Sequence, residues 1–287
     1  MKSILLATQF LIFTFCLSSE AILATNSNDI DYTRKDKRIF QKIVNQFSED
    51  KQKPINELII DIALYFQDTP YVAGTLEHNE EEKLVINLQE TDCILFVEMC
   101  YALAHTIKTE QPSFEYYCNF VRNTRYINGK IDGYPSRHHY TSGWIQQNIE
   151  KGLVEELSSE MGRPLDQEFS YMSSNPQSYK QLTGNVGNQR KIIEVEDGLN
   201  KYDYHFLNKE DLANNTSKIK NGDIICFVSV VEGLDISHVA YAYWVQDTLH
   251  FIHASSVAKK VVIEEKSLYD YTRYGLRIVR PIKSSDN

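Results

Sequence analysis

Residues 91–104, TDCILFVEMCYALA, place a cysteine at the start of a predicted helix that is apolar on nearly every face. With Thr91 as the N-cap, Cys93 falls in the first helical turn, where backbone N–H groups are unpaired and the helix dipole is positive. Both features favour a thiolate over a thiol, so the stretch predicts a nucleophilic cysteine. The alternative is a small core residue, because a lone cysteine in an apolar helix is usually buried.

The other cysteines of the chain provide internal comparisons. Cys100, Cys118 and Cys226 lie in apolar or aromatic runs without a capping residue before them, and we predict that they fill the core. Together with Cys93 they form no closely spaced framework, and a chain of 287 residues can bury a sufficient core without disulfides. The cysteine pattern is therefore compatible with a free catalytic thiol.

The N-terminus has the pattern of a secretory signal peptide. Lys2 precedes a short apolar stretch, and small residues follow, with Ala21 or Ala24 as the expected cleavage site. The apolar stretch is too short to cross a membrane comfortably, so no stable membrane insertion is expected. We therefore expect a leader at 1–24, export across an inner membrane into the periplasm, and a single catalytic domain at 25–287.

The overall composition argues against several classes of partner. The formal net charge is −9 and no run is rich in Lys and Arg, so nucleic acid is not expected to bind. The sequence contains no His-Glu-x-x-His motif, no paired Cys-x-x-Cys motifs and no glycine-rich phosphate loop, so we expect neither a metal nor a cofactor. Hydrophobic residues make up 42% of the chain, enough for one large core, and we expect a monomer.

Hydrophobic periodicity separates a helical half from a half rich in strands. Apolar residues at helical spacing between positions 39 and 64, interrupted at Lys53-Pro54, predict two helices before the nucleophile, and residues 84–88 predict a short strand. Further strands are predicted at 223–228, 238–245, 249–254, 260–263 and 276–279. The expected fold is α+β, with N-terminal helices and the nucleophile at a helix N-terminus packed on a C-terminal antiparallel β-sheet or small barrel.

The region between these halves, at about 109–184, has weaker periodicity. It contains aromatic residues at 114–117, a turn at 127–130 and the polar and aromatic run 136–144. We expect this region to be an insertion that forms a wall over the site.

Two histidines of the C-terminal half can supply a base and a group that orients it. A two-residue turn at Gln246-Asp247 places His253 opposite Ala240, on the sheet face that carries His238. The two rings are then diagonal neighbours, roughly 7–8 Å apart at the backbone, whereas a slip of one residue would move His253 to the other face. For either histidine taken alone, a surface or core position is the alternative.

Two other residues near this hairpin, His250 and Asp235, carry side chains that can orient an imidazole. In the same register His250 points away from His238, so it is not expected to take part. Asp235, in the loop just before His238, is an alternative orienting group.

Several segments resemble the NlpC-type, papain-like cell-wall cysteine hydrolases. They are Asp92-Cys93 at a helix start, residues 221–227 entering a strand, His238-Val239 opening the next strand, and residues 251–256. Most members of that superfamily carry Ser-Gly after the cysteine, where this chain has Ile94-Leu95, and a long insertion here separates the cysteine from the histidine.

These departures, with residues 69–77, 136–140 and 171–176, are similar to one divergent branch, the NlpC-like N-acetylmuramoyl-L-alanine amidases. The similarity extends over nearly the whole chain after the leader. It implies cleavage of the amide between the lactyl group of N-acetylmuramic acid and L-alanine, with a preference for the 1,6-anhydro form released during recycling of the cell wall. The substrate, a muropeptide or peptidoglycan fragment, is implied by the resemblance alone.

The resemblance also implies roles for residues. Cys93 would be the nucleophile, His238 the general base and then acid, and His253 the group that holds His238 in its productive tautomer. Tyr71 and the backbone N–H of Cys93 would stabilise the oxyanion, with an ordinary wall position as the alternative for Tyr71.

Arg137, His139 and Tyr140 are the candidates for binding substrate, since a sugar-lactyl-peptide offers carboxylates and hydroxyls to bind. The alternative for these three is a hydrogen-bonded turn packed under Trp144.

Two other functions are compatible with the same residues. The first is an endopeptidase that cuts after γ-D-glutamate in the stem peptide, and the second is a catalytically silent glycan-binding protein. The set Cys93, His238 and His253 argues against the second, because binding alone does not require a nucleophile, a base and an orienting group. An acyltransferase is a remote further possibility.

Overall fold

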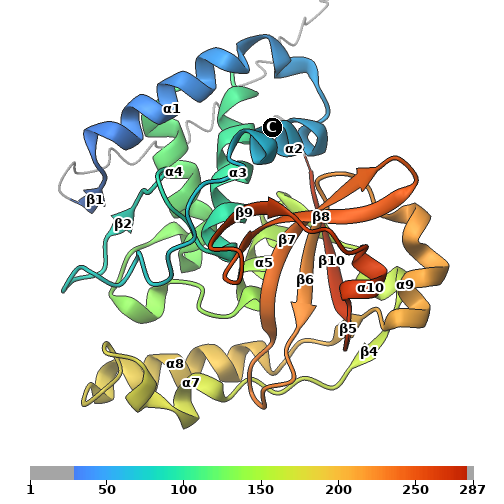
Figure 1. The fold of residues 1–287 in the computed structure, drawn as a ribbon. Coiled ribbons are helices and arrows are strands. Elements are labelled where there is room, and N and C mark those ends of the chain that lie inside the picture. Colours follow the sequence, from blue (N-terminus) through green and yellow to red (C-terminus); the bar gives the residue numbers. More distant parts are fainter. Residues whose placement is uncertain (1–28, 283–287) are drawn as a thin grey trace, which may run out of the picture.

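The computed structural model describes residues 29–282, with most helices in the first part of the chain and an antiparallel sheet in the last part (Figure 1). The α-helices are α1 (Arg34–Gln46), α2 (Ile55–Tyr65), α3 (Cys93–Ile107), α4 (Phe114–Arg125), α5 (Thr141–Glu150), α6 (Ser158–Met161), α7 (Tyr171–Ser174), α8 (Val186–Leu199), α9 (Lys209–Asn215) and α10 (Leu268–Tyr271). Short 3₁₀ helices span Ser48–Gln52, Ile127–Gly129, Tyr134–Ser136, Pro176–Ser178 and Thr216–Lys218. The strands are β1 (Ile30–Asp31), β2 (Leu84–Val85), β3 (Val154–Glu156), β4 (Arg163–Leu165), β5 (Tyr204–Phe206), β6 (Ile224–Val228), β7 (Ile236–Val245), β8 (Thr248–Ser255), β9 (Lys260–Ile263) and β10 (Leu276–Pro281).

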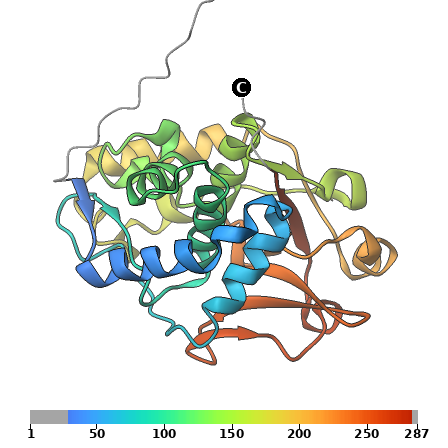
Figure 2. The ribbon, with the colours of Figure 1, turned by 90° about the horizontal axis from the view of Figure 1, so that it is seen from above.

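The helix that begins at Cys93 is the buried centre of the molecule. Every residue of α3 from Leu95 to Ile107 is buried, as expected for a helix that is apolar all round. Helices α2 and α4 and strands β7 and β8 all pack on it. Figures 1 and 2 place α1 and α2 at one end of the molecule and α7 and α8 at the opposite end, with α3 and α4 between them.

The start of α3 differs by one residue from the prediction. The N-cap is Asp92, whose carboxylate accepts a hydrogen bond of 2.9 Å from the N–H of Leu95, so the prediction of Thr91 as the cap is wrong. The reason is tertiary: Thr91 is buried in extended backbone and forms a parallel bridge with Tyr71. Cys93 still lies in the first turn, as its first residue.

The two helices predicted before the nucleophile are confirmed. Helix α1 begins with a capping box, in which the side chains of Thr33 and Asp36 each accept a hydrogen bond from the other residue's backbone N–H. The predicted interruption at Lys53-Pro54 is also present, because Pro54 is the N-cap of α2. The two helices together bury an apolar face against α3 and α4.

The predicted antiparallel sheet is confirmed as six strands in the order β3-β10-β6-β7-β8-β9. The sheet contacts α3 through a hydrogen bond as well as through apolar side chains. The ring of Tyr241 on β7 packs edge-on against Phe96 at 6.1 Å, and its hydroxyl donates a 2.6 Å hydrogen bond to the carbonyl of Val97. The sheet and the first turn of α3 are thereby held together.

The register of the β7–β8 hairpin is the predicted one. Val245 pairs with Thr248 across a two-residue turn, and the pairing continues to Tyr241 with Ile252. Gln246 adopts a positive φ of 53°, which is typical of tight hairpin turns. His253 therefore shares a sheet face with His238.

The middle region, at 109–184, was expected to form a wall over the site, but parts of it belong to the core and to the main sheet. Helix α4 packs on α3, and β3 joins the main sheet beside β10. The rest of the region, with α8, encloses a smaller apolar cluster around Tyr140 and Phe169. The division into a leader and one catalytic domain stays a prediction.

The predicted leader at 1–24 lies outside the described residues. Within residues 29–282, none of the helices combines the length and the apolar composition that are needed to cross a bilayer.

Candidate active site

The nucleophile candidate differs from the other thiols in exposure. Cys93 is half-buried, whereas Cys100, Cys118 and Cys226 are buried, and all four are free thiols. The prediction that these three cysteines fill the core is therefore confirmed. Cys93 is the only one of the four that a reagent or substrate can approach without unfolding the core.

The ionisation of Cys93 differs from the expectation. Burial, and next to it the carboxylate of Asp92, raise the pKa of the thiol to about 11. Hydrogen bonds from the backbone N–H groups of Val239, Ile94 and Cys93 itself lower the pKa but do not overcome these two effects. The N–H groups at the helix start therefore favour the thiolate as expected, but burial, with the carboxylate of Asp92 adding to it, outweighs them, so the thiol is the resting form.

The two histidines meet as predicted. Nε2 of His238 and Nδ1 of His253 are 2.6 Å apart, so one ring donates a hydrogen bond to the other. The ring of Phe227 stacks on His238 with centroids 5.8 Å apart, and Phe251 packs edge-on against His253 at 4.9 Å. Burial lowers the pKa of His238 to about 3 and that of His253 to about 4, so both are neutral at neutral pH.

The thiol lies against the strand that carries the base. The backbone N–H of Val239, the residue after His238, is a hydrogen-bond donor that acts on the Cys93 thiol. Because Nε2 of His238 faces His253, Nδ1 is the ring nitrogen of His238 that takes no part in this contact. Cys93, His238 and His253 come from α3, β7 and β8, and all three side chains are neutral at neutral pH.

His250 and Asp235, the other polar residues considered near the two histidines, form hydrogen bonds elsewhere. Nδ1 of His250 donates to the carbonyl of Glu264 at 3.0 Å, consistent with its predicted place on the other face. Asp235 is buried and accepts a 2.7 Å hydrogen bond from the N–H of Ser142, so it is engaged away from the histidines. Sequence reasoning missed Glu264, whose carboxylate lies 3.6 Å from Nε2 of His253.

Tyr71 borders the thiol. Burial raises the pKa of its phenol, and the charges of Cys93 and Asp92 add to the rise. Tyr71 and Thr91 form a parallel β-bridge. The bridge holds the backbone of Tyr71 beside the residue that precedes Asp92, the N-cap of α3.

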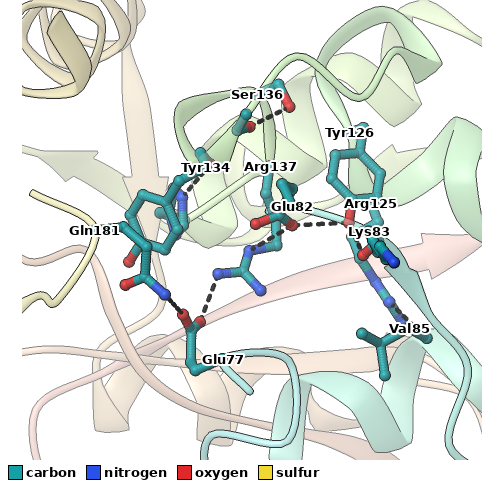
Figure 3. A network of polar contacts seen from close by, with 12 residues as sticks. Glu77, Glu82, Lys83, Val85, Arg125, Tyr126, Tyr134, Ser136, Arg137 and Gln181 are labelled. Atoms are coloured by element: carbon teal, nitrogen blue, oxygen red, sulfur yellow. Dashed lines mark hydrogen bonds and ion pairs between the residues drawn. The ribbon is translucent and has the colours of Figure 1, made fainter. Parts of the chain in front are cut away.

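Arg137 is the centre of a buried polar network (Figure 3). Its Nη2 donates to Glu77 at 2.5 Å, and its Nε lies 3.7 Å from the buried carboxylate of Glu82. Gln181 donates to the other oxygen of Glu77 at 2.7 Å, and Tyr126 donates to Glu82 at 2.8 Å. Arg137 is only 5% exposed, and its Nη1 is a buried donor with no hydrogen-bond partner among residues 29–282.

His139 is half-buried and Tyr140 is buried, and both are paired within the protein. Nε2 of His139 donates to the carbonyl of Tyr134 at 2.8 Å, and the two rings lie 4.1 Å apart. The hydroxyl of Tyr140 donates to Glu196 at 2.6 Å and accepts from the N–H of Met172 at 3.0 Å. These contacts favour the alternative of a hydrogen-bonded turn for both residues.

An open cavity of about 610 Å³ adjoins the network of Arg137. Glu82, Tyr134 and Gln181 line both the network and the cavity, and the rest of its wall is strongly polar. Cys93, His238 and His253 are not among its lining residues, so the cavity is separate from these three side chains.

Comparison with known proteins assigns the chain to a family. A family model described as AmiA-like, N-acetylmuramoyl-L-alanine amidase-like, matches residues 61–275. The chain belongs to this AmiA-like family. The crystal structure of an N-acetylmuramoyl-L-alanine amidase from Bacteroides uniformis ATCC 8492 is similar, with 35% sequence identity and a TM-score of 0.76. That match covers 80% of this chain and 99% of the other.

Other solved structures share the architecture of this AmiA-like chain. A protein of Bacteroides fragilis, named as a supposed xylanase, is 36% identical with a TM-score of 0.73, and the match covers 77% of this chain and 99% of that one. A Legionella pneumophila protein is 21% identical with a TM-score of 0.61 over 86% of this chain and 95% of that one, a similarity of fold alone. No curated protein matches the chain.

Proposed function

We propose that this AmiA-like protein is a cysteine-dependent N-acetylmuramoyl-L-alanine amidase with an NlpC-like, papain-like catalytic core. The observation that carries the proposal is the 2.6 Å contact between His238 and His253 on the strands that pack against the helix of Cys93. Family membership supplies the substrate class, and the three side chains supply the means of cleaving an amide.

In the proposed reaction the sulfur of Cys93 attacks the lactyl carbonyl carbon. The thiol and His238 are both neutral at rest, so the thiol proton moves to Nδ1 of His238 as the sulfur–carbon bond forms. His238 then gives this proton to the nitrogen of L-alanine as the carbon–nitrogen bond breaks. Water cleaves the resulting thioester, with His238 taking its proton, and Cys93 is released as the thiol.

The tetrahedral intermediate carries its negative charge on the former carbonyl oxygen. The first N–H groups of a helix have no partner within the helix, and the N–H of Cys93, which acts on the thiol at rest, is the first donor to that oxygen in this proposal. The Tyr71 hydroxyl is the second donor in this proposal. Its raised pKa keeps it protonated, and therefore able to donate, over the whole physiological range.

We assign substrate contact to Arg137 and a supporting role to His139 and Tyr140. The unpartnered Nη1 of Arg137 is a buried donor that a carboxylate or carbonyl oxygen of the muropeptide would satisfy. His139 and Tyr140 hold the turn that follows Arg137 through their contacts with Tyr134 and Glu196. A preference for 1,6-anhydro muropeptides, and action in the periplasm after export, belong to the same proposal.

The test is mass spectrometry of the products formed from a defined anhydro-disaccharide-peptide. The chain without residues 1–24 is expected to release the free anhydro-disaccharide and the intact stem peptide. Cys93→Ala should abolish turnover, and Cys100→Ala, which removes a buried thiol, should retain it. Cleavage inside the stem peptide would replace the proposal by an endopeptidase, and substantial turnover by folded Cys93→Ala would refute the cysteine mechanism.

A further inference from the structure

The second histidine of the site has one ring nitrogen without a hydrogen bond. His253 is 2% exposed, and its Nε2 is buried with no hydrogen-bond partner among the described residues. The nearest acidic group is the carboxylate of Glu264, whose Oε2 lies 3.6 Å away. This distance is slightly longer than a hydrogen bond, as is common for catalytic contacts in ligand-free sites.

The backbone holds Glu264 beside His253. The N–H of Glu264 donates to the carbonyl of Phe251 at 2.9 Å, and its own carbonyl accepts from Nδ1 of His250 at 3.0 Å. Val262 pairs with His253 in the β8–β9 ladder, so Glu264, two residues further on, is the diagonal neighbour of His253 on the same face. The Glu264 side chain is 21% exposed, which leaves it room to move by the short distance that closes the contact.

The 2.6 Å contact between the two histidines admits two arrangements of protons. In the first, Nε2–H of His238 donates to Nδ1 of His253, which leaves Nδ1 of His238 free to accept the thiol proton. In the second, Nδ1–H of His253 donates to Nε2 of His238, and the proton on Nδ1 of His238 blocks it as a base. The first arrangement alone puts a proton on Nε2 of His253, the atom that faces Glu264.

We infer that Glu264 is a positioning residue that holds His253 in the Nε2–H tautomer and thereby keeps Nδ1 of His238 free to act as the base for Cys93. A carboxylate accepts hydrogen bonds and donates none, so it stabilises the first arrangement and not the second. The inference rests on the proposed cysteine mechanism for its effect on turnover, but the tautomer itself is a property of the free protein.

The test compares Glu264→Ala, Glu264→Gln and Glu264→Asp in the chain without residues 1–24. Long-range ¹⁵N–¹H NMR reports which ring nitrogen of each histidine carries the proton, and His253→Gln assigns the His253 signals by their loss. Wild type is expected to show His253 with its proton on Nε2, and Glu264→Ala is expected to show a mixture of the two forms. Glu264→Asp should restore the wild-type pattern in large part.

Turnover of the anhydro-disaccharide-peptide gives a second measurement. Removing an outer partner that orients a functional histidine typically costs about 10- to 100-fold, so we expect a loss of that size in kcat for Glu264→Ala with KM unchanged. Glu265→Gln, which changes the adjacent exposed glutamate, is the matched control and should behave as wild type.

The outcomes separate this inference from the proposed function. A proton on Nδ1 of His253 in wild type, or the same tautomer and kcat in folded Glu264→Ala as in wild type, would overturn the role of Glu264 whatever the substrate is. A wild-type protein that shows the Nε2–H tautomer but does not cleave the muropeptide would refute the proposed substrate and leave the positioning role standing.

Discussion

Replacing Asp92 with asparagine is expected to make Cys93 more reactive. Asparagine caps helices about as well as aspartate, so the hydrogen bond to the N–H of Leu95 and the start of α3 should be kept. The variant removes the second-largest cause of the raised pKa of Cys93, while burial, the largest cause, stays. The reactivity of the thiol therefore changes without a change in fold.

The size of the effect follows from the pKa of Cys93, about 11. At pH 8 about one thiol in 1,000 is then ionised. A charge this close shifts a pKa by about one unit or more, so Asp92→Asn should raise the thiolate fraction about tenfold. The thiolate also becomes less nucleophilic as its pKa falls, which reduces the gain in rate to about threefold.

The assay is the rate of reaction with dithiodipyridine between pH 6 and 9, corrected with Cys93→Ala for the buried thiols. Asp132→Asn, which removes an exposed carboxylate paired with Lys191, is the control and should leave the rate unchanged. An unchanged or slower rate in folded Asp92→Asn would refute the conclusion that this carboxylate suppresses ionisation of Cys93.

Two further predictions concern stability. Burial lowers the pKa of His253 from 6.5 to about 4 on folding. The stability that the neutral, buried ring contributes to the free energy of unfolding is therefore present above pH 6.5 and is lost as the pH falls towards 4. His253→Gln should therefore flatten the pH dependence of the free energy of unfolding in urea by about 1.4 kcal/mol per pH unit in this window, and parallel wild-type and variant curves would contradict this. Glu98 pairs with Arg125 at 2.8 Å with both side chains buried, so Glu98→Gln should lower the free energy of unfolding by about 3 kcal/mol by leaving the guanidinium without its anion. Glu265→Gln, on an exposed glutamate, should change it by less than about 0.5 kcal/mol, and an equal loss in both variants would show that burial of the pair is not the cause.

Local sequence patterns were sufficient to predict the β7–β8 hairpin. A two-residue turn at Gln246-Asp247 determines which residues of β7 and β8 are opposite each other, and the alternation of side chains in strands then brings His238 and His253 to one face. Both steps depend on residues within 16 positions of one another along the chain. The same holds for the helix of Cys93, whose apolar composition predicted its burial.

Contacts between distant segments decided the properties that local patterns did not. Thr91 is held in a bridge with Tyr71 while Asp92 caps the helix, and burial of Cys93, with the charge of Asp92 adding to it, raises the pKa so that the thiol is favoured over the expected thiolate. The bridge is formed by two backbone hydrogen bonds, from the N–H of Val72 to the carbonyl of Thr91 and from the N–H of Thr91 to the carbonyl of Pro70, between segments about 20 residues apart that no local pattern brings together.

The substrate-side candidates illustrate the same limit. The run that contains Arg137 predicted groups suited to binding a sugar-peptide, but Glu77 and Glu82, from a loop more than 50 residues earlier, occupy most of its guanidinium (Figure 3). Glu196, on a helix more than 50 residues later, occupies the hydroxyl of Tyr140. Whether a polar side chain faces substrate or protein depends on such partners.

The sequence by itself determined the N-terminal helices and the C-terminal strands, the first-turn position of Cys93 and the pairing of the two histidines, because hydrophobic period and turn length act over a few residues. The tertiary structure alone decided the ionisation of Cys93, the burial of Arg137 and Tyr140, and the approach of Glu264 to His253. The physical reason is that pKa values and hydrogen-bond partners depend on burial and on charges within a few ångströms, which the folded chain brings together from remote positions.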